Sequence, residues 1–199
     1  DSTHMQPLTS VMNTKYIITD VSERKKFYGC PYICGIDIFP LDYIPSNEEE
    51  LNTFRNIYTV VYSTAREFNQ YTIEERERYL NLIEEMCNTN IDRNENIQNQ
   101  LWLLLDKVAG IFNKDECEYL TYLPTNICYN PELKYKKEWF TGVKRFPFEY
   151  ISVPVANGYD ELLKITYGDY MQYDRQRGRA HNYPFYKKQE DFLIKNNLM

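Results

Sequence analysis

The apolar residues between positions 46 and 113 recur at steps of three and four, which is the period of an amphipathic α-helix. This pattern predicts three helices, at about 46–69, from 72 onward and at about 94–112. None of them carries a pattern typical of a catalytic centre, and their charged residues form solvated faces. The predicted core positions include Leu51, Phe54, Tyr58, Val61, Leu80, Ile83, Leu101, Leu105 and Val108.

Two helix starts have a capping signal. Ser46 is followed three residues later by Glu49, and Thr72 is followed by Glu75. A hydroxyl at the N-cap and a glutamate at the third helical position satisfy backbone N–H groups that the first turn leaves unpaired. Ser46 and Thr72 are therefore the predicted N-caps of the first two helices.

The segment before the helices has a residue pattern typical of β-strands. Residues 15–20 are β-branched and aromatic, and residues 32–39 form a short run that is apolar on both faces. Such a run is typical of a central strand covered by helices. Pro40 has no N–H for a sheet ladder, so the strand should end near Phe39 and leave Asp37 close to its C-terminal end. Open α/β sheets bind ligands at such ends.

After residue 118 the chain changes to short pieces between proline and asparagine breaks. A basic aromatic segment at 134–140 is either a solvated loop or a contact for an anionic acceptor. Gly168 should end a short helix by taking a left-handed conformation. The other predicted elements are extended or irregular pieces at 119–123 and 126–129, a strand at 146–154 and that helix at 158–167.

The length and hydrophobic content fit one domain, and the predicted strands and helices place it in the α/β (α+β) class. At 199 residues and 43% hydrophobic, the chain is long enough for one core. Residues 1–5 read like a vector leader, so the predicted domain is 6–199, with strands in 6–45, helices in 46–113 and a mixed part in 114–199. It contains no apolar run long enough to span a membrane. A net charge of −6 argues against nucleic acid as its main partner.

Five scattered cysteines give no disulfide framework, which favours a reducing compartment. Cys30 and Cys34 form one close pair without a second, so buried thiols are favoured over a zinc site. The nineteen tyrosines suit either an aromatic-rich core or a pocket for a sugar or polyol.

The candidate chemistry centres on residues 35–42, where Asp37 and Asp42 interrupt an apolar run. A carboxylate buried among Ile, Phe and Leu costs several kcal/mol unless a cation or hydrogen-bond donors meet it. A divalent metal at Asp37 is the sharpest prediction. Near the C-terminus, arginine forks next to a histidine suit the phosphates of a nucleotide diphosphate, although a solvated loop explains them too. These residues are Arg175, Arg177, Arg179 and His181.

Two separated segments jointly resemble one family. Residues 35–42 are similar to the IDIFPLD signature of the LicD family, the phosphocholine-transferase-like proteins related to fukutin. Later elements resemble the C-terminal pattern of the same family in order and approximate spacing. These elements are Phe148-Glu149, Val153-Pro154, Tyr159–Leu163 and Tyr167–Met171, followed by His181.

The resemblance implies a nucleotidyltransferase-type fold with an incomplete sheet. It also implies transfer of a phosphocholine-like group from a nucleotide diphosphate donor, such as CDP-choline, to a glycan or lipid-linked glycan acceptor. Asp37 matches a metal-binding carboxylate for Mg²⁺ or Mn²⁺, which would bridge the substrate phosphates. The implied location is cytoplasmic, including the inner face of the membrane. Substrate-binding roles fall to Asp42, Tyr167, Asp169 and the three arginines, and His181 is the candidate general base.

The chain departs from the family pattern in one important respect. Members carry an Asp-x-Asp pair upstream of the IDIFPLD signature, and this sequence contains no Asp-x-Asp. We therefore expect the chain to correspond to the C-terminal two thirds of such an enzyme and to need an N-terminal segment for activity. The alternative is a non-catalytic glycan-binding or scaffolding module. The sequence does not identify the donor alcohol, the acceptor or the oligomeric state.

Overall fold

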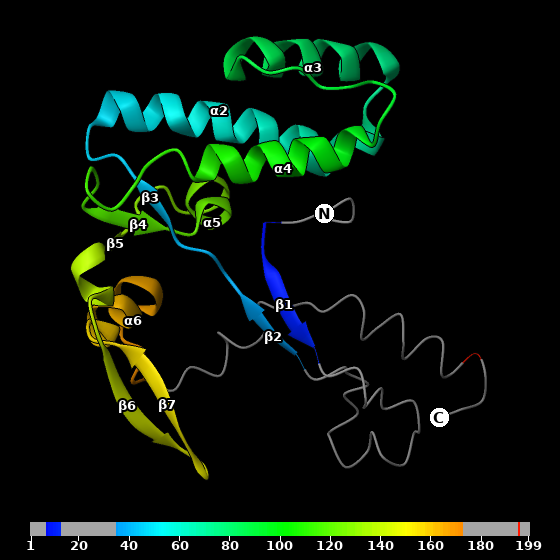
Figure 1. Cartoon of the computed structure of the whole chain (residues 1–199). Coiled ribbons are helices and arrows are strands. Elements are labelled where there is room, and N and C mark those ends of the chain that lie inside the picture. Colours follow the sequence, from blue (N-terminus) through cyan, green and yellow to red (C-terminus); the bar gives the residue numbers. More distant parts are fainter. Residues whose placement is uncertain (1–6, 13–34, 173–194, 196–199) are drawn as a thin grey trace. The chain divides into compact units, whose positions relative to one another are not determined.

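The computed structural model describes residues 7–12, 35–172 and 195 (Figure 1). The chain divides into two compact units. The described part of the first is residues 7–8 and 39–168, and that of the second is residues 9–12, 35–38, 169–172 and 195. Over these residues the fold is mixed α+β, with five α-helices and three small antiparallel sheets, which confirms the broad class predicted from the sequence.

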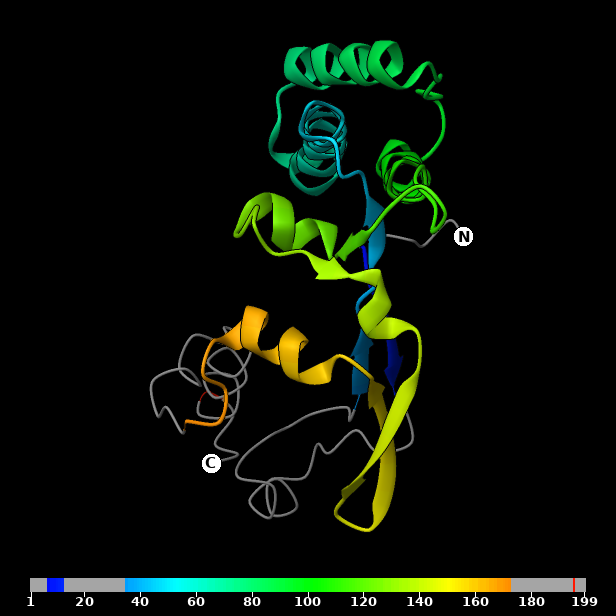
Figure 2. The same cartoon turned by 90° about the vertical axis from the view of Figure 1, so that its left-hand side faces the viewer.

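The first unit is organised by a layer of three helices, α2 (Glu48–Glu67), α3 (Ile73–Cys87) and α4 (Ile97–Ala109). A 3-10 turn, η1 (Phe68–Gln70), follows α2. Figures 1 and 2 show α2 and α4 side by side, with α3 running across them. The periodicity therefore predicted all three helices correctly. Their facing sides form the core, which includes Leu51, Phe54, Tyr58, Val61, Leu80, Ile83, Leu101, Trp102, Leu105 and Val108.

The predicted N-cap residue is confirmed at α3 and wrong at α2. Thr72 forms the expected capping box with Glu75 at the start of α3. At α2 the N-cap is Asn47 instead of Ser46, because the Asn47 side chain accepts from the backbone N–H of Glu50 at 2.9 Å. Asparagine caps a helix as well as serine does, so the sequence signal was shifted by one residue.

A three-stranded antiparallel sheet lies beneath the helices, in the order β3 (Asp42–Ile44), β4 (Tyr119–Thr121) and β5 (Tyr135–Lys136). A short helix, α5 (Leu123–Cys128), follows β4, and a 3-10 turn, η2 (Lys137–Phe140), follows β5. The prediction of an extended or irregular piece at 126–129 is thus wrong for most of that segment. Pro124 lies in the first turn of α5, where its missing N–H costs nothing.

A buried polar network joins α5 to its neighbours. Asn126 is fully buried and donates to the backbone carbonyls of Pro131 and Leu133, at 2.9 and 3.0 Å. Its own carbonyl accepts from the guanidinium of Arg55 on α2. The Thr121 hydroxyl also donates to Leu133, at 2.6 Å. These bonds satisfy the polar groups of an irregular chain segment that packs against the core.

The C-terminal part of the first unit is a β-hairpin, β6 (Val143–Phe148) and β7 (Ile151–Ala156), followed by helix α6 (Tyr159–Tyr167). The predicted strand at 146–154 is thus two strands, with a turn at Glu149 and Tyr150. Gly168 ends α6 with φ 69°, so the predicted positive φ is confirmed. Gly158 is required by a close approach, since a Cβ there would lie 2.4 Å from Trp139.

The second unit contains a two-stranded antiparallel ribbon, β1 (Thr9–Met12) and β2 (Gly35–Ile38). A strand was predicted at 32–39, and its described part is β2. The prediction that it is buried on both faces is wrong, because Ile36 is 72% and Ile38 49% exposed on one face and Asp37 is exposed on the other. A two-stranded ribbon cannot enclose its own faces. The predicted strand at 15–20 and the pair Cys30 and Cys34 lie outside the described residues. Among the helices that the structure describes, none is long and apolar enough to cross a membrane.

Candidate functional site

The first candidate group surrounds Asp42, the second carboxylate of the 35–42 segment. Asp42 begins β3, opposite the buried Thr121 of β4, and is itself half-buried. Removal from water, together with the negative charge of Asp106 on α4, raises the pKa of Asp42 to about 6. Asp42 is therefore a carboxyl group that changes its protonation state close to neutral pH.

Tyr58 lies in the electrostatic environment of this carboxyl group, and a second tyrosine, Tyr122, lies in that of Tyr58. Tyr58 on α2 is 2% exposed, and its pKa lies well above its ordinary value because of burial and the nearby charge of Asp42. Tyr122 also raises the pKa of Tyr58, and its ring meets that of Phe39 edge to face, with centroids 5.0 Å apart. The Tyr58 phenol therefore stays protonated and can donate a hydrogen bond.

A carboxyl group with these properties is suited to proton transfer. A general base works best when its pKa lies near the working pH, because it is then both ionised and basic enough to accept a proton. An ordinary exposed aspartate is too acidic for that role. The Asp42 environment thus has the properties of an acid–base site, and it is formed by the sheet and the helical layer of one unit.

The other predicted site residues lie elsewhere. Asp37 is on β2, opposite Ser10, and is exposed in the second unit. Tyr167, at the end of α6 in the first unit, is 56% exposed, and Asp169 is an exposed residue of the second unit. The remaining predicted residues lie outside the described part of the chain: Arg175, Arg177, Arg179 and His181.

The predicted metal site was tested against the donor atoms that the structure supplies. Mg²⁺ prefers near-octahedral oxygen coordination, and protein sites commonly combine carboxylates with phosphate oxygens and water. In the described ranges, no three His, Cys, Asp or Glu side chains come together in a group that could hold a metal ion. The described residues therefore do not fit a self-sufficient Mg²⁺ or Mn²⁺ site at Asp37.

Sequence reasoning missed Asp106, Tyr58 and Tyr122 as members of the candidate site. Tyr58 was assigned to the core because it falls in the apolar stripe of α2, and it is indeed buried there. Asp106 lies between the buried positions Leu105 and Val108 of α4. The one available signal was a carboxylate beside the apolar face of a helix, which is common on solvated helices as well.

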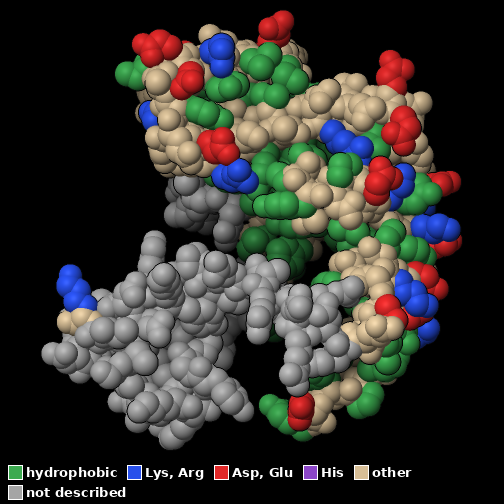
Figure 3. Space-filling view, turned by 180° about the vertical axis from the view of Figure 1, so that it is seen from behind, with side chains coloured by type: hydrophobic (Ala, Val, Ile, Leu, Met, Phe, Trp, Pro, Cys, Tyr) green, Lys and Arg blue, Asp and Glu red, His purple; other side chains and the backbone are tan. Residues whose placement is uncertain are grey.

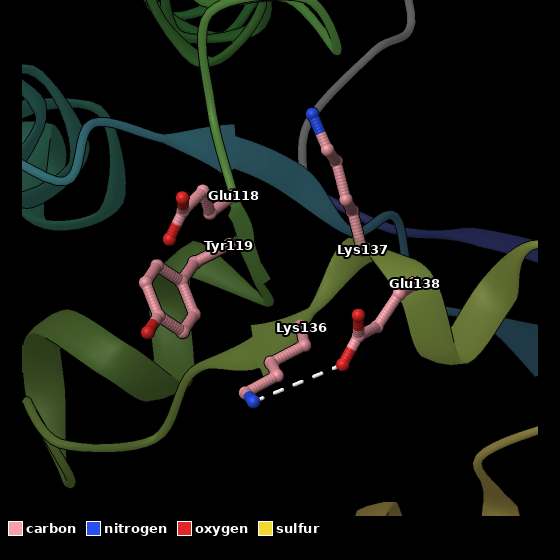
Figure 4. Close-up of a pocket in the computed structure, with 5 residues that line it drawn as sticks. All are labelled: Glu118, Tyr119, Lys136, Lys137 and Glu138. Carbon is pink, nitrogen blue, oxygen red and sulfur yellow. Dashed lines mark ion pairs between the residues drawn. The ribbon is translucent and has the colours of Figure 1, made fainter.

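A second candidate is a small pocket at the outer edge of the β3-β4-β5 sheet, with a volume of about 290 Å³ (Figure 4). It is lined by two glutamates, two lysines and one aromatic ring, and it includes part of the basic aromatic segment predicted at 134–140. The lining residues are Glu118, Tyr119, Lys136, Lys137 and Glu138.

No family model matches the chain, and neither the curated proteins nor the solved structures contain a significant match to it.

Proposed function

We propose that the chain is the larger part of a LicD-type phosphotransferase, which moves a phosphocholine-like group from a nucleotide diphosphate donor to a hydroxyl group of a glycan acceptor. The observation that carries the proposal is the half-buried Asp42, with its pKa near 6, at the end of the segment that resembles the IDIFPLD signature. Phosphoryl transfer to a sugar hydroxyl needs a proton acceptor of this kind near neutral pH.

In the proposed reaction, the acceptor hydroxyl oxygen attacks the phosphorus atom that carries the choline. The new oxygen–phosphorus bond forms as the bond to the nucleoside monophosphate breaks, and that monophosphate leaves with the electron pair. The hydroxyl proton passes to the ionised Asp42 carboxylate. Tyr58 acts as a positioning residue, because its buried phenol interacts electrostatically with this carboxyl group.

The remaining predicted residues keep their roles within the proposal. Arg175, Arg177 and Arg179 would contact the donor diphosphate, since a guanidinium fork matches phosphate oxygens. Asp42 is the proposed general base, and His181 is the alternative candidate for that role. A bound Mg²⁺ or Mn²⁺ would neutralise charge on the phosphates, with Asp37 as one ligand and the others supplied by residues beyond those described. We assign no reaction step to the metal.

Nucleotide release tests this proposal directly. The chain, and the chain extended by its native upstream sequence, would be incubated with Mn²⁺, a glycan acceptor and CDP-choline, CDP-ethanolamine, CDP-glycerol or CDP-ribitol. We expect release of CMP from at least one donor by the extended protein. Asp42→Asn should lower the rate by about 10²-fold or more, because general-base catalysis typically contributes that much.

The matched control is Asp115→Asn, which removes an exposed carboxylate of the same type. It should leave the rate unchanged. If the extended protein releases no nucleotide from any donor, the enzyme proposal fails and the glycan-binding alternative replaces it. Equal rates for Asp42→Asn and the unsubstituted protein would remove Asp42 from the reaction and leave His181 as the base to test.

A further inference from the structure

The pocket at the β4–β5 edge is built by the register of the sheet. Tyr119 on β4 is directly opposite Lys136 on β5, and Ile44 on β3 is opposite Tyr119. These three residues form one row across a single face. Along the row, exposure rises from the fully buried Ile44 to the half-buried Tyr119 and the exposed Lys136. The row thus starts in the core and ends in an open polar site.

The opposite face of the same strands is closed. Leu120 and Tyr135 form a cross-strand pair there and are 6% and 7% exposed. Tyr135 packs against Phe140 and shares a hydrogen bond of 3.1 Å with Thr166 of α6. The opposite face of these strands is therefore packed, and Tyr119 stands on a paired strand rather than on a loop.

The charges around the Tyr119 ring are already balanced. The Lys136 ammonium lies 3.7 Å from the Glu138 carboxylate, and the Lys137 ammonium donates to the backbone carbonyl of Lys114 at 2.6 Å. In Figure 4 the Lys137 side chain points away from Lys136 and Glu138. The two lysines and two glutamates of the lining carry no net charge. On the face that Figure 3 draws, acidic and basic side chains are interspersed.

This arrangement discriminates among ligand types. An anion such as phosphate would meet two carboxylates and would have to displace existing partners of both ammonium groups. A quaternary ammonium group favours an aromatic face, but the Lys134 ammonium, 5.0 Å from the centre of the Tyr119 ring, would repel a second cation there. A neutral polyhydroxyl ring suits the site, because its hydroxyl groups can both donate to carboxylates and accept from ammonium groups. Its apolar C–H face can pack on a tyrosine.

We infer that the pocket formed by Glu118, Tyr119, Lys136, Lys137 and Glu138 binds one neutral sugar unit of a glycan. The inference rests on the proposed function in one respect, namely that this sugar belongs to the acceptor. Asp42 and Ile44 lie two residues apart on β3, so Asp42 is on the sheet face that carries Tyr119. The β5 edge is two strand spacings, about 10 Å, from β3, and the fully buried Ile44 and Thr121 close the direct path between them, so the pocket would hold an acceptor unit remote from the one that reacts at Asp42.

The test is ligand-observed NMR on the full chain with uncharged methyl glycosides of glucose, galactose and N-acetylglucosamine at millimolar concentrations. We expect saturation transfer from the protein to at least one glycoside. Tyr119→Leu should weaken its binding about fivefold or more through the lost ring contact, and Glu138→Gln should weaken it by a smaller factor. Tyr129→Leu, at a tyrosine that is 80% exposed and outside the pocket, is the matched control and should bind like the unsubstituted chain.

Melting curves would accompany each variant, and Tyr119→Phe, which keeps the ring, should retain binding. If Tyr119→Leu fails to fold, Lys136→Met on β5 and Glu138→Gln on η2 test the same pocket from its other side. Three results overturn the inference: no transfer to any glycoside, stronger binding of inorganic phosphate or choline than of glycosides at these residues, or equal binding by the pocket variants and the control. Neither metal nor nucleotide is present, so this assay and the CMP-release assay fail independently.

Discussion

The helical layer and the C-terminal hairpin of the first unit differ sharply in how far their apolar side chains are buried. Every helix of the α2–α3–α4 layer contributes fully buried side chains to one core. In contrast, all six residues of β6 are exposed, and α6 has no buried residue. The hairpin nevertheless has an apolar face, formed by Phe146, Phe148, Ile151, Val153 and Val155.

The difference shows where stability resides and where surface remains for other contacts. The middle of the hairpin face is partly covered, since Phe146 packs on Tyr159 with ring centroids 5.1 Å apart and is 39% exposed. Its tip is not, because Phe148 is 61%, Ile151 51% and Tyr150 96% exposed. Exposed apolar area contributes little to folding free energy. We therefore expect the layer to tolerate substitution poorly and the hairpin tip to tolerate it well.

The largest expected effect is at Leu101, a fully buried residue of α4. Leu101→Ala should lower the free energy of unfolding by about 3–5 kcal/mol, because it removes buried methyl groups and leaves a cavity. Phe148→Ala at the hairpin tip should change it by less than about 1 kcal/mol. Urea denaturation followed by circular dichroism measures both. Similar losses for the two variants would contradict the contrast between the regions.

The next effect is at Asn126, where the sheet joins the helical layer. Asn126→Ala should cost about 2 kcal/mol, since the carbonyls of Pro131 and the buried Leu133 lose a donor and Arg55 loses an acceptor. The control is Asn69→Ala, which removes an exposed side chain with one long hydrogen bond of 3.4 Å and should cost under about 0.5 kcal/mol. Equal melting temperatures for the two variants would show that the network does not stabilise the junction.

The pH dependence of stability tests the environment of Asp42. Its folded pKa of about 6 lies above the ordinary value of 3.8, so between these values the native state binds more protons than the unfolded state. The favourable contribution of this group is complete below about pH 4 and is lost as the pH rises through about 6. After allowance for solvent screening we expect about 1–2 kcal/mol.

Asp42→Asn should remove this dependence and stabilise the protein above pH 6. The measurement is a set of urea titrations between pH 4 and pH 8, with Asp115→Asn as the control for an exposed carboxylate. Parallel curves for Asp42→Asn and the unsubstituted chain would rule out a strongly perturbed Asp42.

The smallest expected effect on the free energy of unfolding is at the N-cap of α2, where the helical layer begins. Asn47→Ala should cost about 1 kcal/mol through the lost bond to the N–H of Glu50, whereas Ser46→Ala should cost less than about 0.5 kcal/mol. Thermal melting of the two variants compares the caps directly. A larger loss for Ser46→Ala would restore the N-cap that the sequence predicted.

The same contrast explains how far the sequence could predict the fold. Helices of 13 to 20 residues present several turns of periodic burial, so α2, α3 and α4 could be recognised from the amino-acid pattern alone. The strands of the β3-β4-β5 sheet are only two or three residues long. Alternation cannot be read over so few positions, and the helix at Leu123–Cys128 was missed because asparagine and proline break the local pattern.

The sequence could predict that the candidate site contains a carboxylate, but it could not predict which residues form the site. The sequence singled out two carboxylates at 37 and 42, and it favoured Asp37. In the structure Asp42 has the perturbed environment, and Asp37 lies exposed on a ribbon. Burial depends on what packs over a strand, and the packing residues, Tyr58 and Asp106, come from helices that are distant in the sequence. Only the tertiary fold brings them together.

The turn at the hairpin tip has a consequence for protein engineering. Glu149 adopts φ 53°, a left-handed conformation that disfavours any residue with a Cβ by about 1 kcal/mol. Glycine would relieve this strain, so Glu149→Gly should raise the melting temperature. The same substitution removes one carboxylate from the hairpin turn. A single substitution at position 149 would therefore both stabilise the folded state and remove a negative charge from the hairpin tip. A variant that is more stable but less active would assign that carboxylate to function rather than to architecture.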